Sequence, residues 1–112
     1  MYVYRAFVRK VYDGDTITVD IDLGFEVLLK NQKLRLYGIN TPEVRGESRE
    51  EGLRVRDLVR GRIANKWITV KTHRDKKGKY GRWLAEIYEI GVEESLNDWL
   101  LKEGNAVEFM KG

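Results

Sequence analysis

The residues best suited to chemistry stand in one stretch, 34–43, which reads Leu-Arg-Leu-Tyr-Gly-Ile-Asn-Thr-Pro-Glu. It begins like a strand, with Leu34 and Leu36 on one face and Arg35 on the other. Proline cannot donate a ladder hydrogen bond and pushes the preceding residue toward an extended backbone, so Glu43 leaves the sheet in a defined direction. A fixed cation, an amide able to bind a metal and a carboxylate thus lie within ten residues. This combination is more typical of a phosphodiester-cleaving site than of a surface turn.

A second carboxylate, Asp15, begins a segment that alternates in the manner of a strand through residue 22. Asp15 falls on the same face as Ile17 and Ile21, so it points the same way as an apolar row. A carboxylate at the mouth of a core is costly unless it is paired, hydrogen-bonded or bound to a metal. Taken alone, such an aspartate more often caps a turn. Metal binding is the alternative interpretation.

Length and composition indicate one folded domain. The chain has 112 residues, enough for one core but not for two, so we expect a single domain over residues 1–112. It is 42% apolar and 35% charged, and no run of about 18 apolar residues predicts a membrane span. The N-terminus alternates like a strand and lacks the features of a signal peptide, which favours an intracellular location unless a leader has been removed. The absence of cysteine excludes disulfides and thiolate chemistry.

Charge is segregated along the chain. The net charge is zero over residues 1–43, +8 over residues 44–82 and −5 over residues 83–112. A basic middle segment suits a polyanionic partner such as nucleic acid. A solvated helix and loop of mixed charge is the commoner meaning of such a run, and charge alone favours that reading.

The elements that must position these residues begin with strands. We expect a strand over residues 3–12, a turn at Asp13-Gly14 and a strand over residues 15–22. A third strand over residues 25–29 and a polar turn over residues 30–33 should lead into the stretch that starts at Leu34. Ser48 and Glu51 form a capping-box pattern before a helix. That helix carries an apolar stripe and an arginine-rich outer surface, while Gly52 and Gly61 weaken it locally.

The second half predicts two more strands and a short helix. Strands are expected over residues 67–73 and 83–90, with a basic loop over residues 74–80 between them. Ser95 is a suitable N-cap for the last helix, and Gly104 is placed to end it. The predicted fold class is α+β, mostly β: a five-stranded OB-type Greek-key barrel with two packed helices. OB barrels bind oligonucleotides, sugars and proteins, so the fold alone does not decide the function.

Four motifs in order resemble those of the staphylococcal nuclease (thermonuclease) family, and together they span most of the chain. They are Asp-Gly-Asp-Thr at 13–16, Arg-Leu-Tyr-Gly-Ile-Asn-Thr-Pro-Glu at 35–43, Lys-Tyr-Gly-Arg-Trp-Leu-Ala at 79–85, and Asn97 with Gly104. Any one motif is weak, whereas four in this order and spacing are specific. The resemblance implies an OB-type barrel and a calcium-dependent phosphodiesterase that acts on DNA and RNA.

The resemblance also implies roles for particular residues. It makes Asp15, the side chain of Asn40 and the backbone carbonyl of Thr41 ligands of Ca²⁺, a hard cation that takes oxygen ligands. Glu43 would be the general base that activates water. Arg35 and Arg82 would bind the scissile phosphate and stabilise its five-coordinate transition state. The residues expected to contact nucleic acid are Arg74, Lys76, Lys77, Lys79 and Tyr80.

Two departures from the family pattern modify these expectations. Asn40 stands where the family's enzymes commonly carry aspartate, so we expect weaker calcium binding than in the aspartate form. The sequence ends soon after Phe109, where the secreted enzymes continue with aromatic residues, so we expect poorer base stacking. Asp20 and Asp22 are assigned to solvent because they alternate with Asp15, while Asp13 is a candidate to support it.

Two functional hypotheses follow. The first is a metal-dependent nuclease of low base specificity that acts on single strands or frayed duplexes of DNA or RNA through the basic region around residues 74–82. We expect the chain to be a monomer. The second is a barrel that has lost catalysis and only binds nucleic acid or protein. The set of Arg35, Glu43 and Arg82 favours the enzyme, because a binding module has no need for it. Asn40 favours the binding module.

Overall fold

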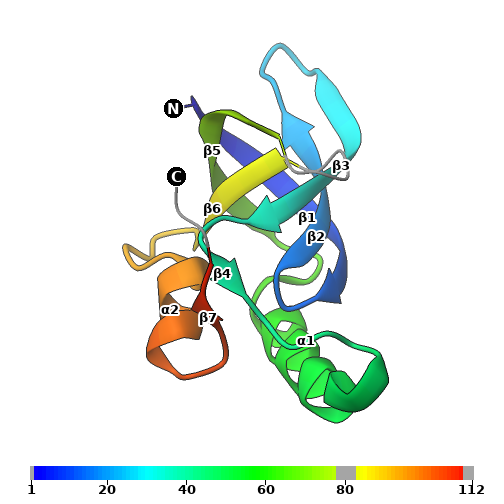
Figure 1. Ribbon diagram of the computed structural model, residues 1–112. Helices are drawn as coiled ribbons and strands as arrows, with labels where there is room; N and C mark the ends of the chain where they lie inside the picture. Colours follow the sequence, from blue (N-terminus) through cyan, green and yellow to red (C-terminus); the bar gives the residue numbers. More distant parts are fainter. Residues whose placement is uncertain (1, 78–82, 110–112) are drawn as a thin grey trace.

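The chain folds into a closed barrel accompanied by two helices (Figure 1). The computed structural model describes residues 2–77 and 83–109, with only the backbone described for residues 74–77. The barrel order is β1-β2-β3-β6-β5, in which β3 and β6 pair in parallel and the other neighbours are antiparallel. The barrel strands are β1 (Tyr2–Asp13), β2 (Thr16–Asp22), β3 (Leu28–Leu36), β5 (Trp67–Lys77) and β6 (Trp83–Glu89). The predicted fold class is confirmed.

The remaining elements lie around the barrel. A small antiparallel sheet joins β4 (Ile39–Asn40) to β7 (Val107–Glu108). A short 3-10 turn, η1 (Gly46–Ser48), leads into α1 (Arg49–Ile63), and α2 (Leu96–Lys102) follows β6. In Figure 1, α1 lies across one end of the barrel and α2 lies beside β7. No helix among the described residues is long and apolar enough to cross a membrane.

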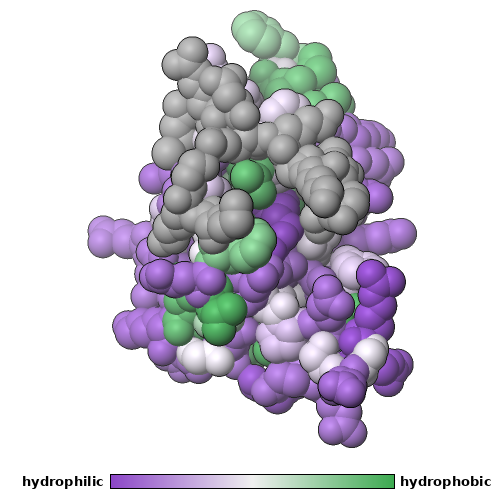
Figure 2. All heavy atoms as spheres, viewed as in Figure 1, coloured by the Kyte–Doolittle hydropathy of each residue, from purple (hydrophilic) through white to green (hydrophobic). Residues whose placement is uncertain are grey.

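The core is formed by alternate strand residues and one face of each helix. Val55, Val59 and Ile63 of α1 are fully buried and pack with barrel residues such as Ile17 and Ile68. Burial of this stripe holds α1 in place, since a helix of this length has little stability of its own in water. Figure 2 shows a mostly hydrophilic surface in this view, with apolar side chains at the top, beyond β2 and β3, and a second apolar group at the lower left, near α2.

The turn between β2 and β3 differs from the prediction. A strand over residues 25–29 and a turn over residues 30–33 are wrong, because the chain reverses at residues 23–27 and residues 28–36 then form the single strand β3. Phe25 and Glu26 take positive φ angles of 53° and 62° in this reversal. Within β3, Asn31 has a φ of 57° and donates its backbone N–H to Asp20 Oδ1 at 3.0 Å. The polar residues therefore form a bulge in the strand and not a turn.

Two other local expectations meet different outcomes. The capping box is wrong: the Ser48 hydroxyl caps no N–H of α1 and donates instead to the Glu43 carbonyl oxygen at 3.0 Å. The N-cap of α2 is confirmed, since Ser95 Oγ accepts the Asp98 N–H at 3.0 Å and Gly104 follows the helix with a φ of 76°. Residues 74–77 of the expected basic loop belong to β5.

Candidate phosphodiesterase site

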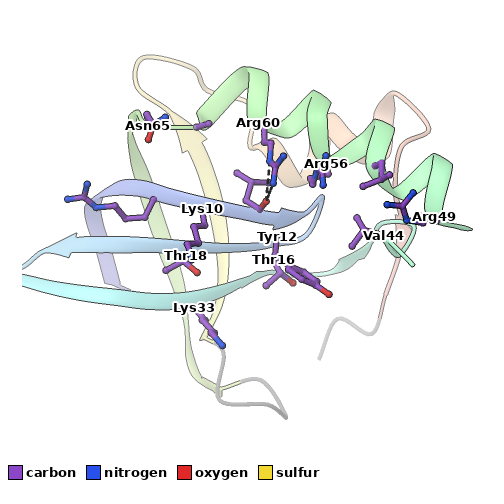
Figure 3. Close-up of a pocket in the computed structure, with 14 residues that line it drawn as sticks. Lys10, Tyr12, Thr16, Thr18, Lys33, Val44, Arg49, Arg56, Arg60 and Asn65 are labelled. Carbon is purple, nitrogen blue, oxygen red and sulfur yellow. Dashed lines mark hydrogen bonds between the residues drawn. The ribbon is translucent and has the colours of Figure 1, made fainter. Parts of the chain in front are cut away.

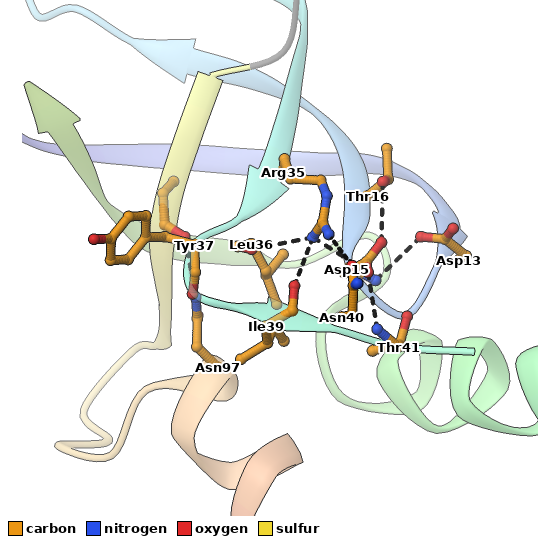
Figure 4. Close-up of polar contacts among 11 residues, drawn as sticks. Asp13, Asp15, Thr16, Arg35, Leu36, Tyr37, Ile39, Asn40, Thr41 and Asn97 are labelled. Carbon is orange, nitrogen blue, oxygen red and sulfur yellow. Dashed lines mark hydrogen bonds and ion pairs between the residues drawn. The ribbon is translucent and has the colours of Figure 1, made fainter. Parts of the chain in front are cut away.

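Arg35 is at the centre of a polar cluster at one end of β3 (Figure 4). In the barrel ladder it faces Thr16 of β2 on one side and Leu84 of β6 on the other. Its Nη1 donates to the carbonyl oxygens of Leu36 at 3.2 Å and Ile39 at 2.9 Å. The guanidinium is therefore fixed by the backbone that leaves the strand, and the side chain is only 11% exposed.

The same guanidinium joins the two side chains expected to bind a metal. Its Nη1 lies 3.2 Å from Asp15 Oδ2, and its Nη2 donates to the side-chain oxygen of Asn40. Asp15 is almost fully buried, and its Oδ2 also accepts the backbone N–H of Thr41 at 2.9 Å. The structure thus brings together predicted site residues from three separate places in the chain. They are Asp15, Arg35, and Asn40 with Thr41.

The carboxylate of Asp15 does not cap the turn in which it lies. That role belongs to Asp13, whose Oδ1 accepts the Asp15 backbone N–H at 3.1 Å. The Asp15 carboxylate accepts hydrogen bonds from the Thr16 hydroxyl at 3.3 Å and from the Thr41 N–H. The backbone carbonyl oxygen of Asp15 accepts the N–H of Leu36 at 2.8 Å. The turn is consequently tied at both its backbone and its side chain to the strand that carries Arg35.

Asp13, which holds the backbone N–H of Asp15, has a perturbed carboxyl group. The pKa of Asp13 is raised to about 7. Burial of its carboxyl group is the largest cause, and the nearby carboxylate of Asp15 contributes to the same shift. A neighbouring carboxylate disfavours the charged form of Asp13. Among the groups described, Arg35 is the cation that contacts Asp15, and none contacts Asp13.

The oxygens of the cluster suit a hard cation. Asp15 supplies a carboxylate, Asn40 an amide oxygen and Thr41 both a carbonyl and a hydroxyl oxygen, which are the donor types that Ca²⁺ takes. The Thr41 hydroxyl is buried and has no hydrogen-bond partner among the described residues. Buried polar atoms normally have a partner, so this orphaned oxygen is consistent with a ligand at the site. No group of three Asp, Glu, His or Cys side chains assembles in the described part of the chain, and the donor set thus carries little negative charge.

Glu43 lies two residues beyond Thr41, at the start of the segment that leads to α1. Its carboxylate is exposed and makes no hydrogen bond or ion pair with any residue that the structure describes. Its backbone, by contrast, is closely held. A Cβ added at Gly52 of α1 would lie 2.0 Å from the Glu43 carbonyl oxygen. Only glycine at position 52 lets the helix approach this segment.

A second glycine performs the same function on the other side. A Cβ at Gly14 would come within 2.7 Å of Val55 of α1 and within 2.8 Å of Thr41. The segment that carries Thr41 and Glu43 is therefore packed between the β1–β2 turn and α1. Sequence reasoning treated Gly52 only as a weak point of the helix and did not find this role. The sole signal was a glycine inside an otherwise regular helical pattern.

Several predicted site residues lie outside the described part of the chain. Arg82, Lys79 and Tyr80 are not among the described residues, and the same holds for the side chains of Arg74, Lys76 and Lys77. The backbone places Arg74, Lys76 and Lys77 in β5. Trp83, the first residue of β6, pairs with Leu34.

The C-terminal segment contributes three contacts that were not predicted. Val107 of β7 pairs with Asn40 of β4, and the backbone N–H of Phe109 donates to the Gly38 carbonyl oxygen at 2.9 Å. The Phe109 ring lies 5.6 Å from the Arg35 guanidinium carbon. These contacts fix the strand that presents Asn40 and place an aromatic ring near the cation.

Asn97 ties α2 to the same region. It is buried and donates from Nδ2 to the carbonyl oxygens of Tyr37 at 2.9 Å and Ala85 at 3.1 Å. Its Oδ1 accepts the Ile87 N–H at 3.1 Å. Every polar atom of this amide is used to hold the turn after β3 against β6, so Asn97 positions the chain and touches no group proposed to react.

Comparison with known proteins places these features in a family. The sequence profile described as "Staphylococcal nuclease homologue" matches residues 33–111. The thermonuclease of Staphylococcus hyicus is 34% identical over 102 residues, covering 88% of this chain and 56% of that protein. The thermonuclease of Staphylococcus intermedius is 32% identical with the same coverage. An uncharacterized protein of Methanocaldococcus jannaschii is 29% identical over 92% of this chain and 58% of its own length. The chain thus spans little more than half of these relatives.

Proposed function

The chain belongs to the staphylococcal nuclease homologue family, and from this premise we propose that it hydrolyses phosphodiester bonds of DNA or RNA. The observation that carries the proposal is the contact of Arg35 with both Asp15 and Asn40. This contact joins a phosphate-binding cation to oxygens suited to a metal. The thermonuclease names of two relatives support the same reaction class.

Arg35 retains donors that a phosphate can use. A guanidinium has five N–H groups. Nη1 is directed at Leu36, Ile39 and Asp15, and Nη2 uses a hydrogen on Asn40. Nε has no acceptor among the described residues. Nε–H and the second Nη2–H share one edge of the guanidinium plane, and such an edge fits two oxygens of one phosphate. The contacts on the other nitrogens hold this edge in place.

The proposed metal ligands are Asp15, Asn40 and Thr41. Bound there, Ca²⁺ would supply positive charge to neutralise the phosphate oxygens. Arg35 contributes the same electrostatic effect from a fixed position, and in the proposal Arg82 contributes it from the segment before β6. A phosphodiester is anionic, so an attacking oxygen approaches it readily only when cations offset that charge.

Glu43 is the proposed general base. In this role its carboxylate accepts a proton from the attacking water as the water oxygen bonds to phosphorus and one P–O ester bond breaks. The departing sugar oxygen then takes a proton from solvent. The carboxylate is exposed and makes no ion pair within the described structure, while the backbone of Glu43 packs closely against Gly52. A rigid backbone with an unengaged carboxylate suits a base that must meet a substrate from solvent.

The test is cleavage of labelled single-stranded DNA and RNA in calcium and then in chelator. We expect calcium-dependent cleavage that is lost in Glu43→Ala and Arg82→Ala. Glu47→Ala is the matched control, because Glu47 is an exposed glutamate in the same segment and the proposal gives it no role. Equal cleavage by Glu43→Ala and Glu47→Ala would exclude Glu43 as the base.

One observation favours a second function. Asp15 is the one carboxylate among the three proposed ligands, and it is already paired with Arg35. A site with so little negative charge holds a cation weakly. A barrel that binds nucleic acid or protein without cleaving it is the alternative, and binding without cleavage in every divalent metal would establish it.

A further inference from the structure

A groove of about 1030 Å³ runs between the outer face of β1 to β3 and the side of α1 (Figure 3). It is lined by six cationic side chains from three elements. These are Arg9, Lys10, Lys33, Arg49, Arg56 and Arg60. None of the described residues that line it is acidic. Arg49, Arg56 and Arg60 of the basic segment thus join cations from β1 and β3 on one concave surface.

The ladder aligns part of this groove with the candidate site. Lys10 of β1 faces Thr18 of β2, which faces Lys33 of β3, so these three side chains form a row on one face of the sheet. The next row on that face contains Thr16 and Arg35. Successive rows on one face lie about 7 Å apart. Arg35 and Lys33 therefore project from the same face of β3 as neighbours.

The groove also borders the site along the chain. Its lining includes Thr16, which contacts Asp15, and Val44, which follows Glu43. A strand bound with one phosphate at Arg35 can therefore continue into the groove without turning around the barrel. The groove does not depend on residues 74–82, to which sequence reasoning assigned nucleic-acid binding.

The cations of the groove differ in whether a carboxylate pairs with them. Arg56 and Arg60 contact Asp57, and Arg9 pairs with Asp20 at 2.6 Å. Lys10, Lys33 and Arg49 are exposed and have no carboxylate partner among the described residues. Arg60 also donates from Nη2 to the Val11 carbonyl oxygen at 3.1 Å, which fixes its guanidinium across the gap between α1 and β1.

An aromatic ring completes the surface. Tyr12 lines the groove and is 57% exposed. A cationic groove with an exposed ring suits a single strand, whose backbone follows the charges while a base stacks on the ring. From Arg49 to Arg60 the helix rises about 16 Å, which is on the order of five phosphates at the spacing of about 3.4 Å found along one strand of a duplex.

We propose that this groove binds the sugar-phosphate backbone of a single-stranded polynucleotide as it extends away from the phosphodiester at Arg35. The inference rests on the proposed function in that nucleic acid is the substrate. It adds a binding tract of several nucleotides that is separate from the reacting groups.

The test measures binding without cleavage. Fluorescence anisotropy would follow a labelled oligothymidylate of about 12 nucleotides in chelator, between about 50 and 200 mM salt. The groove variant is Lys10→Gln with Lys33→Gln and Arg49→Gln. The control is Lys30→Gln with Lys66→Gln and Lys102→Gln, which removes the same charge from exposed positions outside the groove.

Loss of three phosphate contacts should reduce the slope of log affinity against log salt by about 2. Over this salt range the wild type and the control should then lose about 20-fold more affinity than the groove variant. Equal slopes for the groove variant and the control would overturn the inference. If the triple variant fails to fold, the single variants Lys33→Glu and Lys30→Glu provide the same comparison on one strand.

Two further arms separate the possible failures. Polyglutamate that binds as tightly as the oligonucleotide, with the same dependence on the groove, would reassign the groove to acidic peptides and overturn the inference. A wild type that never cleaves but shows the groove-dependent slope would refute the proposed reaction and support the groove. If the wild type cleaves nucleic acid but the groove substitutions leave the salt dependence of binding unchanged, the proposed reaction would be supported and the groove refuted.

Discussion

Arg35 and Asp15 form an ion pair with Nη1 and Oδ2 3.2 Å apart, and their side chains are only 11% and 8% exposed. The pair connects the end of β3 to the β1–β2 turn. Because Nη2 of the same guanidinium also holds Asn40, one side chain sets the position of two proposed metal ligands. Removal of Arg35 should therefore affect more than its own contact with phosphate.

Arg35→Lys should lower kcat for cleavage of single-stranded DNA by roughly 100-fold or more. A lysine keeps the charge, but one ammonium cannot hold Asp15 and Asn40 and still present a fork to a phosphate. Steady-state kinetics in calcium would measure the loss. Arg54→Lys is the control, since Arg54 is an exposed arginine that pairs with Glu51 on the surface of α1. Similar kcat values for the two variants would refute the role of the fork.

Asn40→Asp should strengthen calcium binding, because it replaces a neutral amide oxygen with a carboxylate beside Asp15. Isothermal titration calorimetry of calcium into both proteins would measure the change, with roughly tenfold tighter binding corresponding to about 1.4 kcal/mol. Asn31→Asp is a suitable control, since Asn31 lies in the β3 bulge and not in the cluster. An unchanged calcium affinity in Asn40→Asp would exclude this side chain as a ligand.

Gly52→Ala should destabilise the fold by about 1–3 kcal/mol although alanine is the better helix former. The new methyl would lie 2.0 Å from the Glu43 carbonyl oxygen, so α1 or the Glu43 segment must move. Gly61→Ala is the matched control on the same helix, because nothing lies within 4 Å of the position that its methyl group would take. It should stabilise the protein by about 0.5–1 kcal/mol. Urea unfolding of both variants measures the difference, and stabilisation by both would refute the close packing at Gly52.

Much of the cluster could be predicted because its parts are local in sequence. Arg35, Asn40 and Thr41 lie within one short segment of the sequence, and strand alternation identified Asp15 as a carboxylate needing a partner. The partner itself is the result of register. Thr16 faces Arg35 across β2 and β3, and this pairing brings the preceding residue, Asp15, to the guanidinium.

Three of the incorrect expectations share a physical cause, which is that a group outside the local pattern supplied a hydrogen bond. Asn31 adopts its bulge conformation in contact with Asp20, eleven residues away. The Ser48 hydroxyl is taken by the Glu43 carbonyl oxygen, so it is not available to cap α1. Asp20, assigned to solvent, is 2% exposed because Arg9 and Asn31 enclose it.

The burial of Asp20 predicts a stability that depends on pH. The Asn31 backbone N–H and then Arg9 lower the pKa of Asp20 below its ordinary value of 3.8. A carboxyl group with a lowered pKa in the folded state stabilises the fold above its unfolded pKa, and that stability is lost as the pH falls through the folded pKa. Asp20→Asn should therefore lower the free energy of unfolding at pH 7, and its difference from the wild type should shrink below about pH 4.

Asp22→Asn is the control for this prediction. Asp22 is also in β2, but it is partly exposed and accepts one hydrogen bond, from the Gly24 N–H at 2.8 Å. Its substitution should cost less at pH 7 than that of Asp20, because no cation pairs with it among the described residues. Urea unfolding of the three proteins at several pH values would decide the matter. An Asp20→Asn difference that stayed constant from pH 7 to about pH 3 would show that the ionised carboxylate, and hence its contacts with Arg9 and Asn31, does not hold the β3 bulge.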